Sequence, residues 1–177
     1  VVSEHEVLAD YPLDTAPTGA KGSTNKRGEK FKSHFLEFVD KLVQECAGTE
    51  VLYDSTLFEQ MIGFLTAFSS AHERAFRATG TTAGLQVVSS LVRVVHALGE
   101  GREIAQRQLL AEQKKNKKAV KSKLVQHERE VAQAHARVQA LEETMRSVFG
   151  GIFAHRFRDV DPAIRAESIS SLGFWLR

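Results

Sequence analysis

The sequence predicts an all-α fold that contains a long antiparallel helical hairpin. Of its 177 residues only 3 are proline and 12 are glycine, whereas a sandwich or barrel of short strands needs turn residues more often. Apolar residues recur at helical spacing along most of the chain. In the second half the spacing becomes alternating steps of four and three residues, which is typical of a coiled-coil seam.

Residues 1–28 are predicted to form an extended basic arm or linker. Their composition does not sustain a helix, because serine, threonine and asparagine are mixed with Pro12, Pro17, Gly19, Gly22 and Gly28.

Two helices are predicted after this arm. The first carries an apolar face from Phe31 to Cys46, and the second begins at an Asp54 cap and reaches Phe68. The short loop between them predicts an antiparallel helical pair.

The longest predicted element is a helical hairpin over about residues 85–147. Ser70 and Glu73 form an S-x-x-E capping box ahead of it. One seam of apolar residues runs over residues 88–109 and another over residues 120–152. Because a lysine-rich segment separates the two seams, the simplest arrangement folds them against each other, with arms about 40 Å long at 1.5 Å per residue. An intermolecular coiled coil is the alternative.

Two glycine-containing stretches in this region have different expected roles. Gly99 and Gly101 each cost about 1 kcal/mol relative to alanine in a helix, so they predict a bend in the first arm. The stretch from Gly80 to Gly84 lacks the Lys-Ser/Thr pair of a phosphate-binding loop. Its small residues are expected to let a neighbouring helix approach closely.

The last predicted helix begins at Asp161 and Pro162, since aspartate is a favoured cap and proline suits the first helical turn. The run from Asp161 through Arg165 to Gly173 resembles the HEAT-repeat pattern, in which an aspartate and an arginine tie neighbouring repeats together. The predicted fold therefore combines HEAT-like helical pairs with the long hairpin. The chain ends at Arg177 directly after this apolar helix, which predicts a truncated part of a longer protein.

Positive charge is concentrated in two segments. The net charge is only +2, yet five cations lie between Lys21 and Lys32 and six between Lys114 and Lys123, so the rest of the chain is acidic. Two concentrated basic sites on an acidic body predict directed binding of a polyanion.

Catalytic and cofactor-binding patterns are absent from the sequence. The seven histidines are scattered without zinc-ligand spacing. The single Cys46 excludes an internal disulfide and, at helical spacing from Leu42, is expected to be a buried small hydrophobe. No run of about 18 apolar residues predicts a membrane span. We therefore expect a soluble, intracellular protein that is not an enzyme and has no cofactor, metal, membrane contact or small-molecule substrate.

Five sequence blocks, which occur in family order, resemble the STAG domain and the start of the stromalin conservative domain of cohesin stromalin (STAG/SA-type) subunits. They are Asp10 to Leu13, Lys30 to Phe38, Gly63 to Thr66, Arg74 to Thr79 and Gly151 to Asp159. The last block is the most specific, because its GIF-x-HR-aromatic-RD run leads to an Ile-Arg pair and a Gly-x-Trp. The resemblance implies a STAG helical domain over residues 29–147 and the truncated, HEAT-like start of the conservative domain over residues 148–177.

This resemblance implies a nuclear, chromosome-bound and non-enzymatic cohesin subunit. Such a subunit supports sister chromatid cohesion, helps to hold double-stranded DNA, and binds the kleisin and other cohesin subunits mainly through repeats outside this chain. The family's DNA-contacting lysines lie at the motif around Lys30. The alternative is a HEAT or coiled-coil protein adaptor without direct DNA binding.

We predict DNA contacts at two groups of cations. At the first group a flexible basic arm meets a helix N-terminus, which offers cations and free N–H groups to phosphates together. The second group is the lysine-rich tip of the hairpin. Neither contains a base-reading helix, so binding without sequence preference is expected. The residues are Lys26, Arg27, Lys30 and Lys32 in the first group, and Lys114, Lys115, Lys117 and Lys118 in the second.

Two further sets of residues have competing interpretations. Trp175 matches a tryptophan of a family surface that receives aromatic regulator peptides, although a core position is equally expected. Four arginines are expected to pair with Glu73, Asp159 or Asp161 and to be structural, namely Arg74, Arg77, Arg156 and Arg158.

Overall fold

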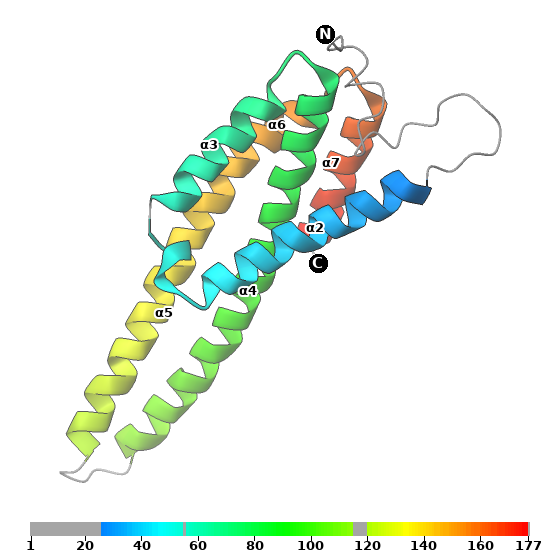
Figure 1. Ribbon diagram of the computed structural model, residues 1–177. Coiled ribbons are helices and arrows are strands. Elements are labelled where there is room, and N and C mark those ends of the chain that lie inside the picture. The colour runs from blue at the N-terminus through cyan, green and yellow to red at the C-terminus, as the bar shows by residue number, and fades with distance from the viewer. Residues whose placement is uncertain (1–25, 55, 115–119, 177) are drawn as a thin grey trace.

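The computed structural model describes residues 26–54, 56–114 and 120–176, except for the side chains of residues 26, 27, 112–114 and 120–124. Every regular element in this part is helical, which confirms the all-α prediction (Figure 1). The elements in chain order are α2 (Lys26–Ala47), the 3₁₀ turn η1 (Glu50–Leu52), α3 (Leu57–Ser69), α4 (Arg74–Lys114), α5 (Val120–Val148), the π-helical turn η2 (Phe149–Phe153), α6 (Ala154–Arg156) and α7 (Pro162–Trp175).

Helices α4 and α5 form the predicted hairpin. They contain 41 and 29 residues and lie side by side in antiparallel directions (Figure 1). The coiled-coil seams therefore pack against each other within one chain, as the hairpin prediction requires. Helix α4 continues through Gly99 and Gly101, so these glycines do not interrupt the arm.

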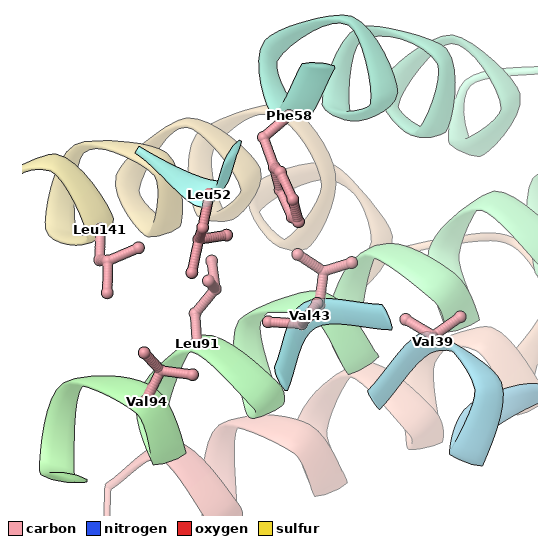
Figure 2. Packing of buried hydrophobic residues seen from close by; sticks show 8 residues of the cluster. Val39, Val43, Leu52, Phe58, Leu91, Val94 and Leu141 are labelled. Atoms are coloured by element: carbon pink, nitrogen blue, oxygen red, sulfur yellow. The ribbon is translucent and has the colours of Figure 1, made fainter. Parts of the chain in front are cut away.

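The core lies where α2, η1 and α3 cover the part of the hairpin away from its tip. Side chains from five elements converge there (Figure 2), and each contributes about 1.5–3 kcal/mol when fully buried. They are Val39, Val43, Leu52, Phe58, Val87, Leu91, Val94 and Leu141. A second cluster of Ile62, Val88, Val148 and Ile152 packs beside Trp175. The seam residues of α4 and α5 thus form one side of a globular core.

By length and composition, residues Arg74–Ala111 of α4 are apolar enough to cross a membrane. However, 56% of that apolar window is buried inside the protein, under the helices that pack on α4. The central helix of a globular core can be as long and as apolar as a membrane-spanning helix. The apolar composition of α4 is therefore explained by its packing in the core.

Close helix packing explains the small residues of α4. A Cβ atom added at Gly80 would lie 2.5 Å from the Ser69 backbone nitrogen, and one at Gly84 would lie 2.3 Å from Cδ1 of Ile152. The backbone of α3 therefore approaches α4 at Gly80 so closely that a larger residue would force it to move, whereas at Gly84 the neighbour is the end of the Ile152 side chain. The close approach at Gly80 agrees with the small-residue prediction.

Two predicted boundaries were wrong. Helix α2 begins at Lys26, so residues 26–28 are helical and do not belong to the arm. Gly28 is buried, and packing outweighs the cost of about 1 kcal/mol for glycine in a helix. Residues 1–25 of the predicted arm lie outside the described residues. Ser70 is the C-terminal cap of α3, and its N–H bonds to the carbonyls of Thr66 and Ala67. It therefore belongs to the end of α3 and does not cap α4, which begins at Arg74.

The starts of the other helices agree more closely with the sequence. The Asp161 carboxylate accepts a hydrogen bond of 2.8 Å from the Ala163 N–H, and Pro162 occupies the first position of α7, as predicted. Asp54 accepts bonds from the N–H and hydroxyl groups of Thr56 at 3.0 and 2.6 Å. It therefore orders the chain just before α3, although the cap position itself is Thr56.

Candidate nucleic-acid interface

The first group of predicted DNA-contacting residues lies on the first two turns of α2. Lys26 and Arg27 are the first two residues of this helix, and the side chain of Lys30 is exposed one turn later. The positive end of the helix dipole at a helix start favours anions. The exposed carboxylate of Glu29 lies in the same turns and reduces the local positive charge.

Lys32 differs from this arrangement. Its Nζ lies 2.9 Å from Oε1 of Glu167 on α7, and each side chain is only 26% exposed. The second oxygen of Glu167 accepts a 2.9 Å hydrogen bond from the Thr82 hydroxyl on α4. Lys32 is therefore paired and half-buried, and its DNA contact stays a prediction. Its contacts tie α2 to the two helices beneath it.

The second group of predicted DNA-contacting residues begins where α4 ends. Lys114 is the last residue of α4, at the end of the hairpin opposite the main body, whereas α2 starts beside α7 (Figure 1). The side chain of Lys114 and the whole of Lys115, Lys117 and Lys118 lie outside the described residues. The end of α4 is therefore distant from the start of α2 (Figure 1), and the DNA contacts of the two groups stay separate predictions.

A second polar contact holds α2 in place. Asp40 on α2 bonds to the guanidinium of Arg93 and accepts a 2.6 Å bond from the Ser90 hydroxyl, both on α4. Burial raises the pKa of Asp40, but the hydrogen bonds from Ser90 and Arg93 outweigh it and hold the pKa below its ordinary value. The direction of α2 across the bundle is thus fixed by ion pairs as well as by its apolar face.

An arginine and aspartate network joins the start of α4 to the segment between α6 and α7. Asp159, whose side chain is 1% exposed, accepts bonds from Arg77 at 3.1 Å and from Arg156 at 2.5 Å. Arg74 pairs with Asp161. The structural interpretation of these three arginines is confirmed, while Arg158 instead lies over the Phe157 ring, 5.8 Å from its centroid.

Acidification is expected to weaken these contacts. Burial raises the pKa of Asp161, but bonds from the Ala163 N–H and Arg74 outweigh it, so its pKa, like that of Asp40, is lowered. A lowered pKa stabilises the fold above the unfolded-state value, about 3.9, and the contribution is lost as pH falls through the folded-state value. Urea unfolding below about pH 4 should therefore show a smaller loss of stability in the Asp40→Asn/Asp161→Asn variant than in the unmodified chain. Equal losses would contradict this assignment.

Trp175 packs within the protein. Its indole Nε1 donates a 3.0 Å hydrogen bond to the Ser89 hydroxyl on α4. Its ring centroid lies 6.4 Å from that of Phe149 and 5.7 Å from that of Phe153. These contacts give Trp175 a structural role, and peptide docking at this residue stays a prediction.

Sequence reasoning missed the residues that hold the interface in place, namely Thr82, Ser90, Arg93 and Glu167. Their partners are distant in sequence, as between Thr82 and Glu167 or Asp40 and Arg93, so no local motif marks them. Among the described residues, no group of three or more histidine, cysteine, aspartate or glutamate side chains is arranged to hold a metal ion.

Helices α2 and α3 each pack on α4 rather than on each other, so the predicted antiparallel pair was wrong. Together with the hairpin and the capped α7 they define a helical scaffold. The STAG domain family matches residues 20–143. The chain belongs to this family, which confirms the resemblance seen in its sequence blocks.

The chain is also similar to individual proteins that are named as cohesion proteins or cohesin subunits. The chain is 36% identical over 156 residues to sister-chromatid cohesion protein 3 of Arabidopsis thaliana, covering 88% of this chain and 14% of the relative. It is 35% identical over 176 residues to cohesin subunit SA-3 of Homo sapiens, covering 98% of this chain and 14% of the relative. The chain thus spans about one seventh of the length of these relatives. The structure of cohesin subunit Scc3 from Z. rouxii has a similar fold, with a TM-score of 0.78 at 23% identity over 93% of this chain and 19% of that one.

Proposed function

We propose that this chain works within a cohesin subunit in the nucleus, as a non-enzymatic scaffold that supports sister chromatid cohesion and binds double-stranded DNA without sequence preference. Family membership and the names of its relatives support the cohesin role. The DNA contact is supported by one observation in particular. Lys26, Arg27 and Lys30 gather on the first turns of α2, whose direction is held by its contacts with α4 and α7.

This geometry suits a phosphate chain better than base edges. A lysine ammonium or arginine guanidinium binds any phosphate, and the positive end of the helix dipole adds to that attraction. The cations lie on the first turns of α2, where the side chain of Lys30 is exposed to an approaching duplex backbone. Such binding is electrostatic and weakens as salt is added, by a slope of about 0.9 for each phosphate neutralised.

The partners of this scaffold are double-stranded DNA, the kleisin and other cohesin subunits. Since the chain spans about one seventh of its relatives, the subunit contacts belong mainly to repeats outside it. Regulator peptides are a further candidate partner at Trp175, where the indole packs between α7 and α4.

Neutralising the α2 cations should weaken DNA binding. In the Lys26→Gln/Arg27→Gln/Lys30→Gln variant, the slope of log affinity against log salt should fall by up to about 2.7, because three phosphate contacts are lost. Fluorescence anisotropy of a labelled duplex over a salt series measures this change. Lys32 is left unchanged because its pair with Glu167 supports the fold.

A matched control removes three exposed cations elsewhere. Arg107, Arg129 and Arg146 lie on the hairpin, and their replacement by glutamine should leave most of the slope intact. A second variant neutralises Lys114, Lys115, Lys117 and Lys118 to test the hairpin tip separately. Unchanged binding by the α2 variant would reject the α2 contact, and no duplex binding at low salt would reject direct DNA binding by this chain.

Exposed apolar side chains favour a second candidate, the protein adaptor. Four of them lie on α3 and at the start of α4, and Phe64 is 66% exposed. They are Leu57, Phe64, Phe68 and Phe76. Exposed apolar patches are typical of protein contacts. An absence of DNA binding, together with a loss of cohesin-subunit binding in a Phe64→Ser variant, would favour this function.

A further inference from the structure

The carboxylate of Glu167 lies beside the candidate DNA interface and joins three helices. One oxygen is 2.9 Å from Nζ of Lys32 on α2, and the other accepts a 2.9 Å bond from the hydroxyl of Thr82 on α4. Glu167 itself is on α7. Both of its oxygens therefore have a partner, and the one nearest α2 occupies the ammonium group of Lys32.

This pair differs from the other lysine pair on α2. Lys41 and Glu37 also lie 2.9 Å apart, but their side chains are 72% and 59% exposed. Solvent screens such a pair, and a competing anion displaces its carboxylate at little cost. The side chains of Lys32 and Glu167 are 26% exposed each, so separating them would leave a half-buried carboxylate without its cation. Lys32 is thus held more firmly than Lys41.

A carboxylate and a phosphate present the same anionic oxygen acceptors to a lysine ammonium group. We propose that Glu167 competes with DNA phosphate for Lys32 and keeps this lysine out of the DNA contact. Duplex DNA at the start of α2 is then held by Lys26, Arg27 and Lys30, and the site binds one phosphate fewer than its cations would allow. This inference rests on the proposed DNA binding at α2.

The Glu167→Gln variant tests the competition. Glutamine keeps the size of the side chain and an oxygen that accepts the bond from Thr82, but it releases Lys32. Duplex affinity at low salt should rise, and the salt slope should become steeper by about 0.9, equivalent to an additional loss of about threefold between 50 and 200 mM salt. The Lys32→Gln variant should keep the salt slope of the unmodified chain, because Lys32 does not contact DNA in that chain.

The double variant Lys32→Gln/Glu167→Gln separates release of Lys32 from a general effect of charge. If Lys32 carries the gain, the slope returns to that of the unmodified chain, and the two substitutions are strongly coupled. Glu29→Gln is the matched control, because it removes a nearby exposed carboxylate and its effect should persist when Lys32 is replaced. Thermal unfolding by circular dichroism checks that each variant is folded.

Three outcomes would overturn the competition while leaving DNA binding at α2 intact. They are an unchanged slope in folded Glu167→Gln, a slope reduced by about 0.9 in Lys32→Gln, and a gain that survives in the double variant. Absence of duplex binding by both the unmodified chain and Glu167→Gln would instead reject the proposed function together with this inference.

Discussion

Replacing Asp159 by alanine is expected to lower the free energy of unfolding by about 3–5 kcal/mol, because it removes a buried carboxylate and leaves two largely buried arginines without their partner. The Asp159 side chain is 1% exposed, and the side chains of Arg77 and Arg156 that bond to it are 12% and 18% exposed. The same carboxylate accepts a 2.9 Å bond from the Asp161 N–H. The substitution therefore removes a negative charge and leaves three hydrogen-bond donors without this acceptor, at a site that water reaches poorly.

Urea unfolding followed by circular dichroism measures this loss. The matched control is Glu143→Ala, which breaks another arginine pair of the same i,i+3 spacing, but one whose side chains are 70% and 78% exposed. Exposed pairs contribute about 0–1 kcal/mol, so the control should remain close to the unmodified chain. A loss below about 1 kcal/mol for Asp159→Ala would show that the network does not hold α4 to the α6 and α7 segment.

The second large effect is expected for Gly80→Ala, which should destabilise the protein by about 2–3 kcal/mol through overpacking. The added Cβ atom would lie 2.5 Å from the Ser69 backbone nitrogen and 2.8 Å from the Leu65 carbonyl oxygen. Because these are backbone atoms, α3 must move away from α4 to make room. The gain of about 1 kcal/mol from replacing glycine by alanine in a helix offsets only part of this cost.

Gly63→Ala is the control for this prediction. Gly63 lies within α3, and a Cβ atom there would meet nothing within 4 Å. The same substitution should therefore stabilise the fold by up to about 1 kcal/mol. Thermal melting of the two variants should shift in opposite directions. A Gly80→Ala variant that melts above the unmodified chain would contradict the close packing of α3 on α4.

The candidate DNA site was only partly predictable. Lys30 is exposed on the helix where a basic run and an apolar face meet, and both features are visible in the sequence. Lys32 belongs to the same run, but its charge is paired with Glu167 on α7. A run of cations shows how much charge is present, whereas tertiary contacts show how much of it is available to a ligand.

The sequence by itself determined the features that depend on neighbours a few residues apart. The four-three seams of α4 and α5, the Asp161 cap with Pro162, and the family blocks are all local patterns, and the structure or the family match agrees with them. Only the tertiary structure decided the start of α2, the end of α3 at Ser70 and the partners of Asp159 and Glu167. The physical reason is that these features depend on packing and ion pairs between segments far apart in the chain, and such contacts override local preferences.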